Sequence, residues 1–168
     1  MRRNKHFPTI LVWLFATCGG IGKIPKCPGT CGALLALMLW TIGRPHIFSP
    51  FAITLLFVGS ILGWRAILHI LRFTSEKDPP YIVIDEFLGQ LLALICVPDT
   101  QIAEIGAFLL FRFFDIKKKG GIRSVDLLSK RSDTSLRMAA ACIIGDDLLA
   151  GLYAGILVRI LGFCMAFL

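Results

Sequence analysis

The chain has 168 residues, a length that favours a single domain spanning 1–168. Its hydrophobic fraction of 56% and mean hydropathy of +0.76 exclude an ordinary soluble domain, because one core of this size could not bury so much apolar surface. The net charge is +7, but aromatic residues are not interleaved with the basic run, as they would be in a nucleic-acid-binding surface. We therefore expect a membrane protein that does not bind nucleic acid, with basic loops facing anionic lipid.

The beginning of the chain imitates a secretory signal peptide. The basic segment Met1–Lys5 is followed by an apolar run from Ile10 to Ala16. Thr17–Gly20 is a poor cleavage site because it lacks a convincing small-x-small pattern. We expect this segment to be retained.

Five further apolar stretches follow, rich in Leu, Ala and Phe and without period-2 alternation, so each predicts a helix. A spanning helix needs about 20 apolar residues, and only the second and fifth stretches approach that length. The sequence predicts an all-α, polytopic transmembrane helical bundle with short or re-entrant helices. The stretches are Gly32–Ile42, Ile47–Trp64, Tyr81–Val97, Ile102–Phe114 and Leu148–Leu168.

The basic residues give this bundle an orientation. If the N-terminal segment lies along one face and the later stretches cross in turn, 15 of the 18 basic residues fall on the starting face. Arg44 lies in an opposite loop, while Arg112 and Arg159 fall within apolar segments. This asymmetry is typical of the positive-inside pattern, so the starting face is predicted to be cytoplasmic.

Acidic residues stand at the predicted cytoplasmic ends of three helices. One pair opens the run Phe87–Val97, a single acid closes Ile102–Phe114, and a second pair opens Leu148–Leu168. A carboxylate buried at membrane depth is costly, so it is usually paired with a cation or has a functional role. Carboxylate oxygens are hard ligands, which favours Mg²⁺. Bound Mg²⁺ would polarise a phosphoryl oxygen and activate water. The predicted metal ligands are Asp85, Glu86, Asp115, Asp146 and Asp147.

Cations suited to a phosphate accompany these acids. Arg112 and Lys118 stand three residues on either side of Asp115, which favours one helix face. The Gly- and Pro-rich stretch 19–32 carries two lysines, one of them Lys26, and leads into a helix start whose free N–H groups suit an anion. It does not match a nucleotide-binding P-loop.

Simpler interpretations exist for each feature alone. An acidic pair at a helix start is often a cap, and Gly151-x-x-x-Gly155 most simply permits close helix packing. Cys27 and Cys31 lack the further ligands that a zinc site requires. The coincidence of three acidic sites on one face favours the metal interpretation.

Four blocks in order resemble the phosphatidylglycerophosphatase A family. They are Pro25-x-x-Pro28-Gly29-Thr30-x-Gly32, Asp85-Glu86-Phe87-x-Gly89, Phe111-Arg112-x-x-Asp115-x-x-Lys118 and Asp146-Asp147-x-x-Ala150-Gly151. The family is bacterial, embedded in the inner (cytoplasmic) membrane and Mg²⁺-dependent, and it hydrolyses phosphatidylglycerophosphate to phosphatidylglycerol and phosphate in phospholipid biosynthesis.

The resemblance implies catalytic roles for Asp85, Glu86, Asp115 and Asp147, metal binding by these four and Asp146, and headgroup contacts from Lys26, Thr30, Arg112 and Lys118. Two departures are visible. Lys119-Gly120-Gly121-Ile122 stands where the family usually has Pro-x-Pro-Ile, which predicts a more flexible loop. The segment Asp126–Asp146 is longer than usual and has Met138-Ala139-Ala140-Ala141 in place of a Gly-rich approach to the Asp pair.

Two alternatives remain open from the sequence. A phosphatidyltransferase would also use Mg²⁺-bound aspartates, but its several aspartates on successive turns of one helical hairpin are missing. A small transporter or scaffold subunit would place ionisable residues near mid-membrane, whereas here they stand at helix ends. We expect a metal-activated water as the nucleophile, since no motif marks one Asp for an aspartyl-phosphate.

Overall fold

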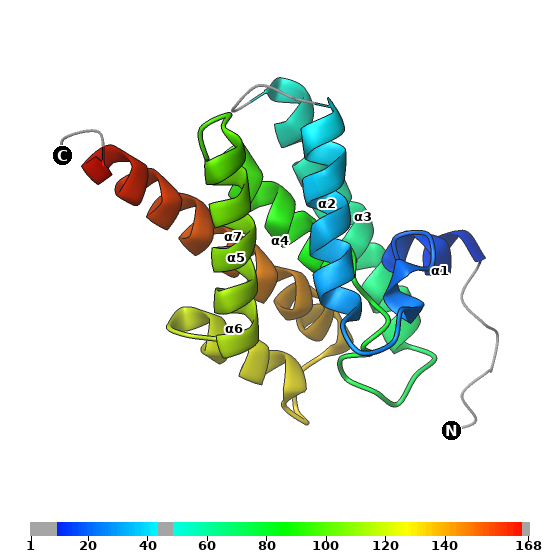
Figure 1. Ribbon diagram of the computed structural model, residues 1–168. Helices are drawn as coiled ribbons and strands as arrows, with labels where there is room; N and C mark the ends of the chain where they lie inside the picture. The colour runs from blue at the N-terminus through cyan, green and yellow to red at the C-terminus, as the bar shows by residue number, and fades with distance from the viewer. Residues whose placement is uncertain (1–9, 44–48, 166–168) are drawn as a thin grey trace.

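The computed structural model describes residues 10–43 and 49–165, and every regular element in these ranges is helical, which confirms the all-α prediction. Met1–Lys5, Arg44 and the first residues of the predicted Ile47–Trp64 helix lie outside the described residues. The elements, drawn in Figure 1, are α1 (Ile10–Ala16), a 3₁₀ turn (Ile21–Lys23), α2 (Pro28–Gly43), α3 (Pro50–Leu71), α4 (Ile84–Ile95), α5 (Gln101–Lys117), α6 (Gly121–Lys130) and α7 (Leu136–Met165).

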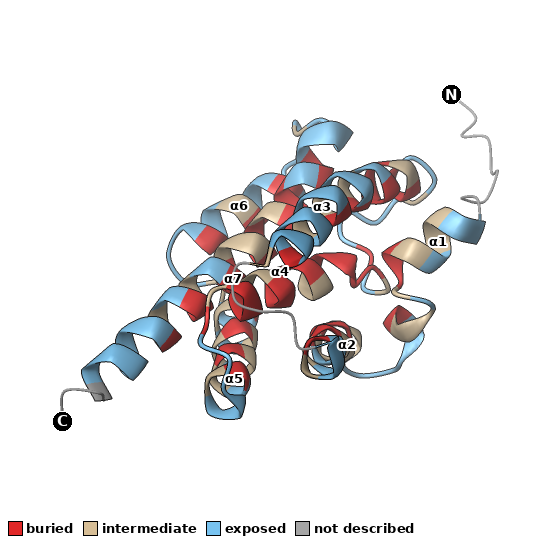
Figure 2. Ribbon diagram, turned by 90° about the horizontal axis from the view of Figure 1, so that it is seen from above, coloured by how far each residue is buried: buried red, intermediate tan, exposed pale blue. Residues whose placement is uncertain are grey.

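Two helices, α4 and α7, form the centre of the bundle. α7 packs against α3, α4, α5 and α6, while α4 packs against α2, α3, α5 and α7. Most residues of α4 are buried although the helix is short, as the red colouring in Figure 2 shows. Both helices therefore bring their side chains to the inside of the bundle.

Glycines let α4 and α7 approach each other closely. A β-carbon added to Gly151 would lie 2.0 Å from the carbonyl oxygen of Gly89, and one added to Gly155 would lie 2.5 Å from Cβ of Cys96. This confirms the prediction that Gly151-x-x-x-Gly155 permits close packing, since a side chain at either position would force the backbones apart.

Two helices within the described residues are long and apolar enough to cross a membrane: Pro50–Leu71, which is α3, and Leu136–Cys164 of α7. α3 also carries exposed large apolar side chains, among them Phe51 at 71% and Phe57 at 67% exposure. The 12 residues of α4 rise only about 18 Å, well short of a hydrocarbon core of about 30 Å. The prediction of short helices beside longer ones is thus met in α4.

The structure corrects two details near the C-terminal half. Helix α6 was not predicted, and α7 begins at Leu136, so the prediction that Asp146-Asp147 opens a helix is wrong: the pair lies inside α7. The helix starts earlier because Ser135 accepts a hydrogen bond from the Met138 N–H (3.3 Å), and the alanine-rich segment that follows has high helix propensity.

Candidate active site

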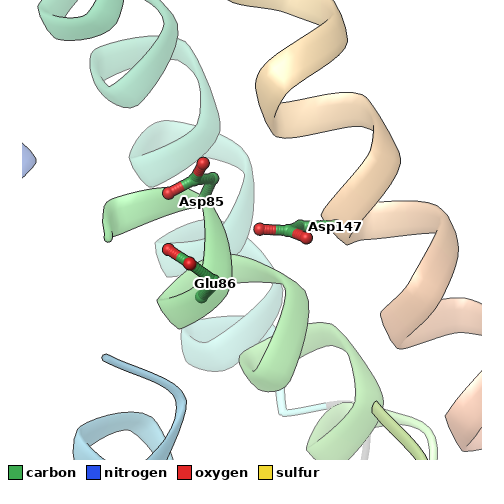
Figure 3. A group of neighbouring side chains, drawn as sticks. All are labelled: Asp85, Glu86 and Asp147. Atoms are coloured by element: carbon green, nitrogen blue, oxygen red, sulfur yellow. The ribbon is translucent and has the colours of Figure 1, made fainter. Parts of the chain in front are cut away.

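Three carboxylates meet where the start of α4 faces the middle of α7. One oxygen from each of Asp85, Glu86 and Asp147 lies within 4.8 Å of the other two, and Figure 3 shows the three side chains converging between the helices. The start of α4 is fixed by the Val83 N–H, which donates to the Ala16 carbonyl at 3.0 Å. The packing of α4 against α7 thus brings together acidic residues that are about 60 positions apart in the sequence.

These carboxylates are poorly compensated by the protein. Asp85 is 6% exposed and Asp147 3% exposed, and one oxygen of each, together with one of Glu86, is buried without a hydrogen-bond partner. Three carboxylates at this separation, those of Asp85 and Asp147 buried and that of Glu86 half-buried, repel one another unless a cation or protons join them. Because all the free ligand atoms are hard oxygens, the group fits a divalent ion such as Mg²⁺.

The first turn of α2 forms a wall of this group. A β-carbon on Gly29 would lie 2.0 Å from Oε1 of Glu86, so only glycine leaves room for the carboxylate in its present place. Gly29 belongs to the Pro-Gly-Thr block that the sequence placed near the phosphate. Its role here is to permit close approach of backbone to Glu86.

A second group of charges lies beside the three carboxylates. Asp115 accepts a hydrogen bond from Arg112 Nη1 at 2.5 Å and lies 3.3 Å from Lys118 Nζ, and the same Nζ donates to Asp146. Burial lowers the pKa of Lys118, but the carboxylates of Asp147, Asp146 and Asp115 outweigh it and raise the pKa above its usual range. The ammonium group therefore stays charged.

Lys118 reaches this position because the helix stops before it. α5 ends at Lys117, and Lys118 adopts the left-handed conformation with φ 47°, followed by Gly120 at φ 64° and the start of α6. Such a conformation is unfavourable for a residue with a β-carbon. The predicted proximity of Arg112, Asp115 and Lys118 is confirmed, although Lys118 lies past the helix end.

Both charge groups open into one pocket of about 220 Å³. Neither Lys26, which is exposed, nor Thr30, which is half-buried, lines it, and Arg112 acts from behind Asp115. The lining residues are Pro28, Asp78, Pro79, Pro80, Ile82, Asp85, Glu86, Asp115, Lys118, Ile143, Asp146 and Asp147.

Sequence reasoning missed two acids near this pocket. Asp126 of α6 lies 2.6 Å from Lys130 Nζ and 3.7 Å from Lys118 Nζ, and Lys130 lies 3.7 Å from Asp78 at the pocket wall. The i,i+4 spacing of Asp126 and Lys130 was a detectable helical signal. Nothing local in the sequence connects Asp78 to the site, because the loop 72–83 brings it there.

Comparison with known proteins agrees with the arrangement. The family model described as Phosphatidylglycerophosphatase A matches residues 14–162. A Bacteroides thetaiotaomicron protein named "Putative phosphatidylinositol-3-phosphatase" is 33% identical, covering 91% of this chain and 94% of the relative.

Two relatives carry the family's own name. The Haemophilus influenzae phosphatidylglycerophosphatase A is 33% identical over 88% of this chain and 86% of its own length, and the Escherichia coli protein of that name is 31% identical over 67% and 66%. No solved structure matches the chain. The family match covers all the acidic residues of the pocket, and the chain belongs to the phosphatidylglycerophosphatase A family of phosphoric monoester hydrolases.

Proposed function

We propose that this chain hydrolyses phosphatidylglycerophosphate to phosphatidylglycerol and phosphate in a Mg²⁺-dependent reaction of phospholipid biosynthesis. The observation that carries the proposal is the trio Asp85, Glu86 and Asp147, which line a pocket together with Lys118 and each keep one carboxylate oxygen without a hydrogen-bond partner. A phosphate monoester needs both a cation to offset its charge and acidic ligands to hold that cation.

The residues divide into two tasks. Asp85, Glu86 and Asp147 would hold the metal, and Asp146 and Asp115 would complete its surroundings while orienting Lys118. When bound, Mg²⁺ supplies Lewis acidity toward a phosphoryl oxygen and lowers the pKa of a water.

The remaining chemistry belongs to the side chains. Lys118 offers its charge to the non-bridging phosphate oxygens, and Arg112 holds Asp115 in place behind it. The oxygen of a water joins phosphorus and the bond from phosphorus to the glycerol oxygen breaks. The water gives up one proton, and the glycerol oxygen takes up one proton and leaves as the alcohol.

The membrane would present the substrate to this pocket. In our proposal α3 and α7 cross the bilayer of the bacterial inner membrane as parts of a multi-pass chain, and the pocket opens to the cytoplasmic face. Supporting this, Lys118 and Lys130 near the pocket belong to the basic set that the charge asymmetry assigns to the cytoplasm. Acyl chains would stay in lipid while the phosphate reaches the acids.

A phosphate-release assay on purified chain tests the proposal. With Mg²⁺ and phosphatidylglycerophosphate, Asp85→Asn and Asp147→Asn should each lose at least about 100-fold in rate, because several kcal/mol of charge stabilisation depend on the metal site. Asp99→Asn, at an exposed turn before α5, is the matched control. Full activity in either site variant would remove that residue from the proposed metal site.

The substrate range is tested in the same assay. Phosphatidylinositol 3-phosphate is the informative competitor, because a relative covered over 94% of its length is named for it. We expect faster release from phosphatidylglycerophosphate, since two relatives are named for that activity. A reversed preference would replace the proposed substrate and leave the phosphatase chemistry unchanged.

A further inference from the structure

The structure contains a second cavity, separate from the acidic pocket. It has a volume of about 620 Å³ and runs between α1, α3 and the first turn of α7. It shares no lining residue with the acidic pocket. A buried apolar cluster separates the two: its Ala66 and Leu68 line the cavity, while its Ile82 and Ile143 line the pocket.

The wall of this cavity has two chemical parts. Leu11 and Phe15 of α1 and Leu62 of α3 supply an apolar part, and Leu11 is 72% exposed. Arg65 of α3, Arg72 directly after the end of α3, and Arg137 of α7 supply a cationic part. An apolar trough with guanidinium groups along it matches a molecule that has hydrocarbon and anionic parts.

The arginines carry charge that the protein leaves available. Among residues 10–43 and 49–165, none of Arg65, Arg72 and Arg137 forms an ion pair with a carboxylate. The backbone at Arg137 is also fixed, because Trp64 Nε1 donates a hydrogen bond to its carbonyl oxygen at 3.0 Å. The three cations therefore line one cavity, and the Trp64 hydrogen bond ties the part of α3 that carries Arg65 to the start of α7.

The cavity also lies at the correct level for a lipid headgroup. Arg65 and Arg72 occupy the C-terminal end of α3, a helix long enough to cross the bilayer, while its exposed apolar residues such as Phe51 and Phe57 lie toward the other end. The described residues of α1, Ile10–Ala16, pack against α3 next to the cavity (Figure 1). A phosphate at the arginines would thus have its acyl chains directed along α3 into the bilayer.

We propose that this cavity binds one anionic membrane phospholipid, with the headgroup phosphate at Arg65, Arg72 and Arg137 and an acyl chain against Leu62 and Phe15. The occupant is a lipid of the surrounding membrane and not the molecule being hydrolysed, because the acids that would hold a metal are on the other side of the buried cluster. The proposal rests on the proposed crossing of the bilayer by α3 and does not depend on the hydrolytic reaction.

Native mass spectrometry of the full chain from non-ionic detergent tests this. The probes are phosphatidylglycerol and phosphatidylcholine with identical acyl chains. We expect the wild type to retain one phosphatidylglycerol in preference to phosphatidylcholine, and the variant Arg65→Gln/Arg72→Gln/Arg137→Gln to bind phosphatidylglycerol about tenfold or more weakly. The three arginines are exposed, so the variant should fold.

Two control variants show whether any loss of lipid binding is specific to the cavity. Lys117→Gln/Lys119→Gln/Arg123→Gln removes the same charge from exposed positions outside the cavity and should bind lipid like the wild type. Asp147→Asn should also retain phosphatidylglycerol. Retention by the arginine variant together with loss in Asp147→Asn would place the lipid in the acidic pocket and overturn the proposal.

Other results would also contradict it. Equal binding of phosphatidylglycerol and phosphatidylcholine by the wild type would remove the role of the arginines. A dimeric wild type that becomes monomeric in the arginine variant, with unchanged lipid binding, would assign the cavity to a second copy of the chain. Displacement of the lipid by millimolar inorganic phosphate would show that the apolar wall holds no acyl chain.

Discussion

Gly89 of α4 and Gly151 of α7 lie against each other in the packing of the two central helices, because a β-carbon on Gly151 would lie 2.0 Å from the Gly89 carbonyl oxygen. Each glycine lies four residues, about one helical turn, after an acid of the candidate metal site: Gly89 after Asp85, and Gly151 after Asp147. The helix crossing therefore sets the separation of the carboxylates.

Gly151→Ala should disrupt both packing and chemistry. The new methyl group would meet backbone atoms that cannot rotate away, so we expect a loss of about 1–3 kcal/mol in stability and a large fall in phosphate release. Thermal unfolding in detergent and the release assay measure the two effects. Gly162→Ala is the control in the same helix, because no atom lies within 4 Å of its added β-carbon.

Gly29→Ala should weaken the phosphatase activity without lowering the stability of the fold. Its β-carbon would lie 2.0 Å from Oε1 of Glu86, the end of a flexible side chain, so the carboxylate can rotate away while the backbone stays. We expect weaker Mg²⁺ activation and little change in unfolding temperature. Thr41→Ala, farther along α2, should change neither. An unaltered Mg²⁺ dependence in Gly29→Ala would show that the position of Glu86 is unimportant.

Lys118→Gln tests the cation beside the trio. It leaves Asp115 and Asp146 without the ammonium group that both contact, and it removes a charge from the pocket. We expect a rate loss on the order of 100-fold, as for removal of one charge-stabilising donor. The neighbouring exposed Lys117→Gln should retain nearly full rate. Equal rates in the two variants would exclude a phosphate contact by Lys118.

Asp126→Asn tests a residue that positions Lys118 from outside the pocket. Asp126 lies 3.7 Å from Lys118 Nζ and 2.6 Å from Lys130 Nζ, and an amide would hold neither cation as strongly. We expect about a tenfold loss, typical of a partner behind a ligand shell, with partial rescue by Asp126→Glu. Asp133→Asn, which breaks an exposed pair with Arg131, should have no effect. Rescue distinguishes positioning from a folding defect.

Hydropathy and charge patterns predicted the helical fold, and the start of α4 and the end of α5 fell within three residues of the predicted runs. The missed features depend on tertiary contacts. Glu104, in the first turn of α5, is only 1% exposed, and its position in the sequence gives no sign of this burial. Periodicity could not show that α7 begins before its apolar run, because an alanine-rich turn extends it.

The sequence predicted which residues belong to the candidate site, but it could not predict how their side chains are grouped in space. Sequence spacing joined Arg112, Asp115 and Lys118 because each cation stands three residues from Asp115, a separation that places side chains on one helix face. It could not divide the five acids into a trio with unpartnered oxygens and a pair that contacts Lys118, since that division depends on how α4 crosses α7. The position of Asp78 depends on a loop whose path has no sequence signature.

Metal-dependent hydrolysis is tested most directly by phosphate release from phosphatidylglycerophosphate by the purified chain before and after removal of divalent metal. We expect release with Mg²⁺, loss to background on chelation, and recovery when Mg²⁺ is restored, with no recovery in Asp147→Asn. Release that continues unchanged in excess chelator would overturn the proposed metal site, because the trio Asp85, Glu86 and Asp147 would then act without a metal.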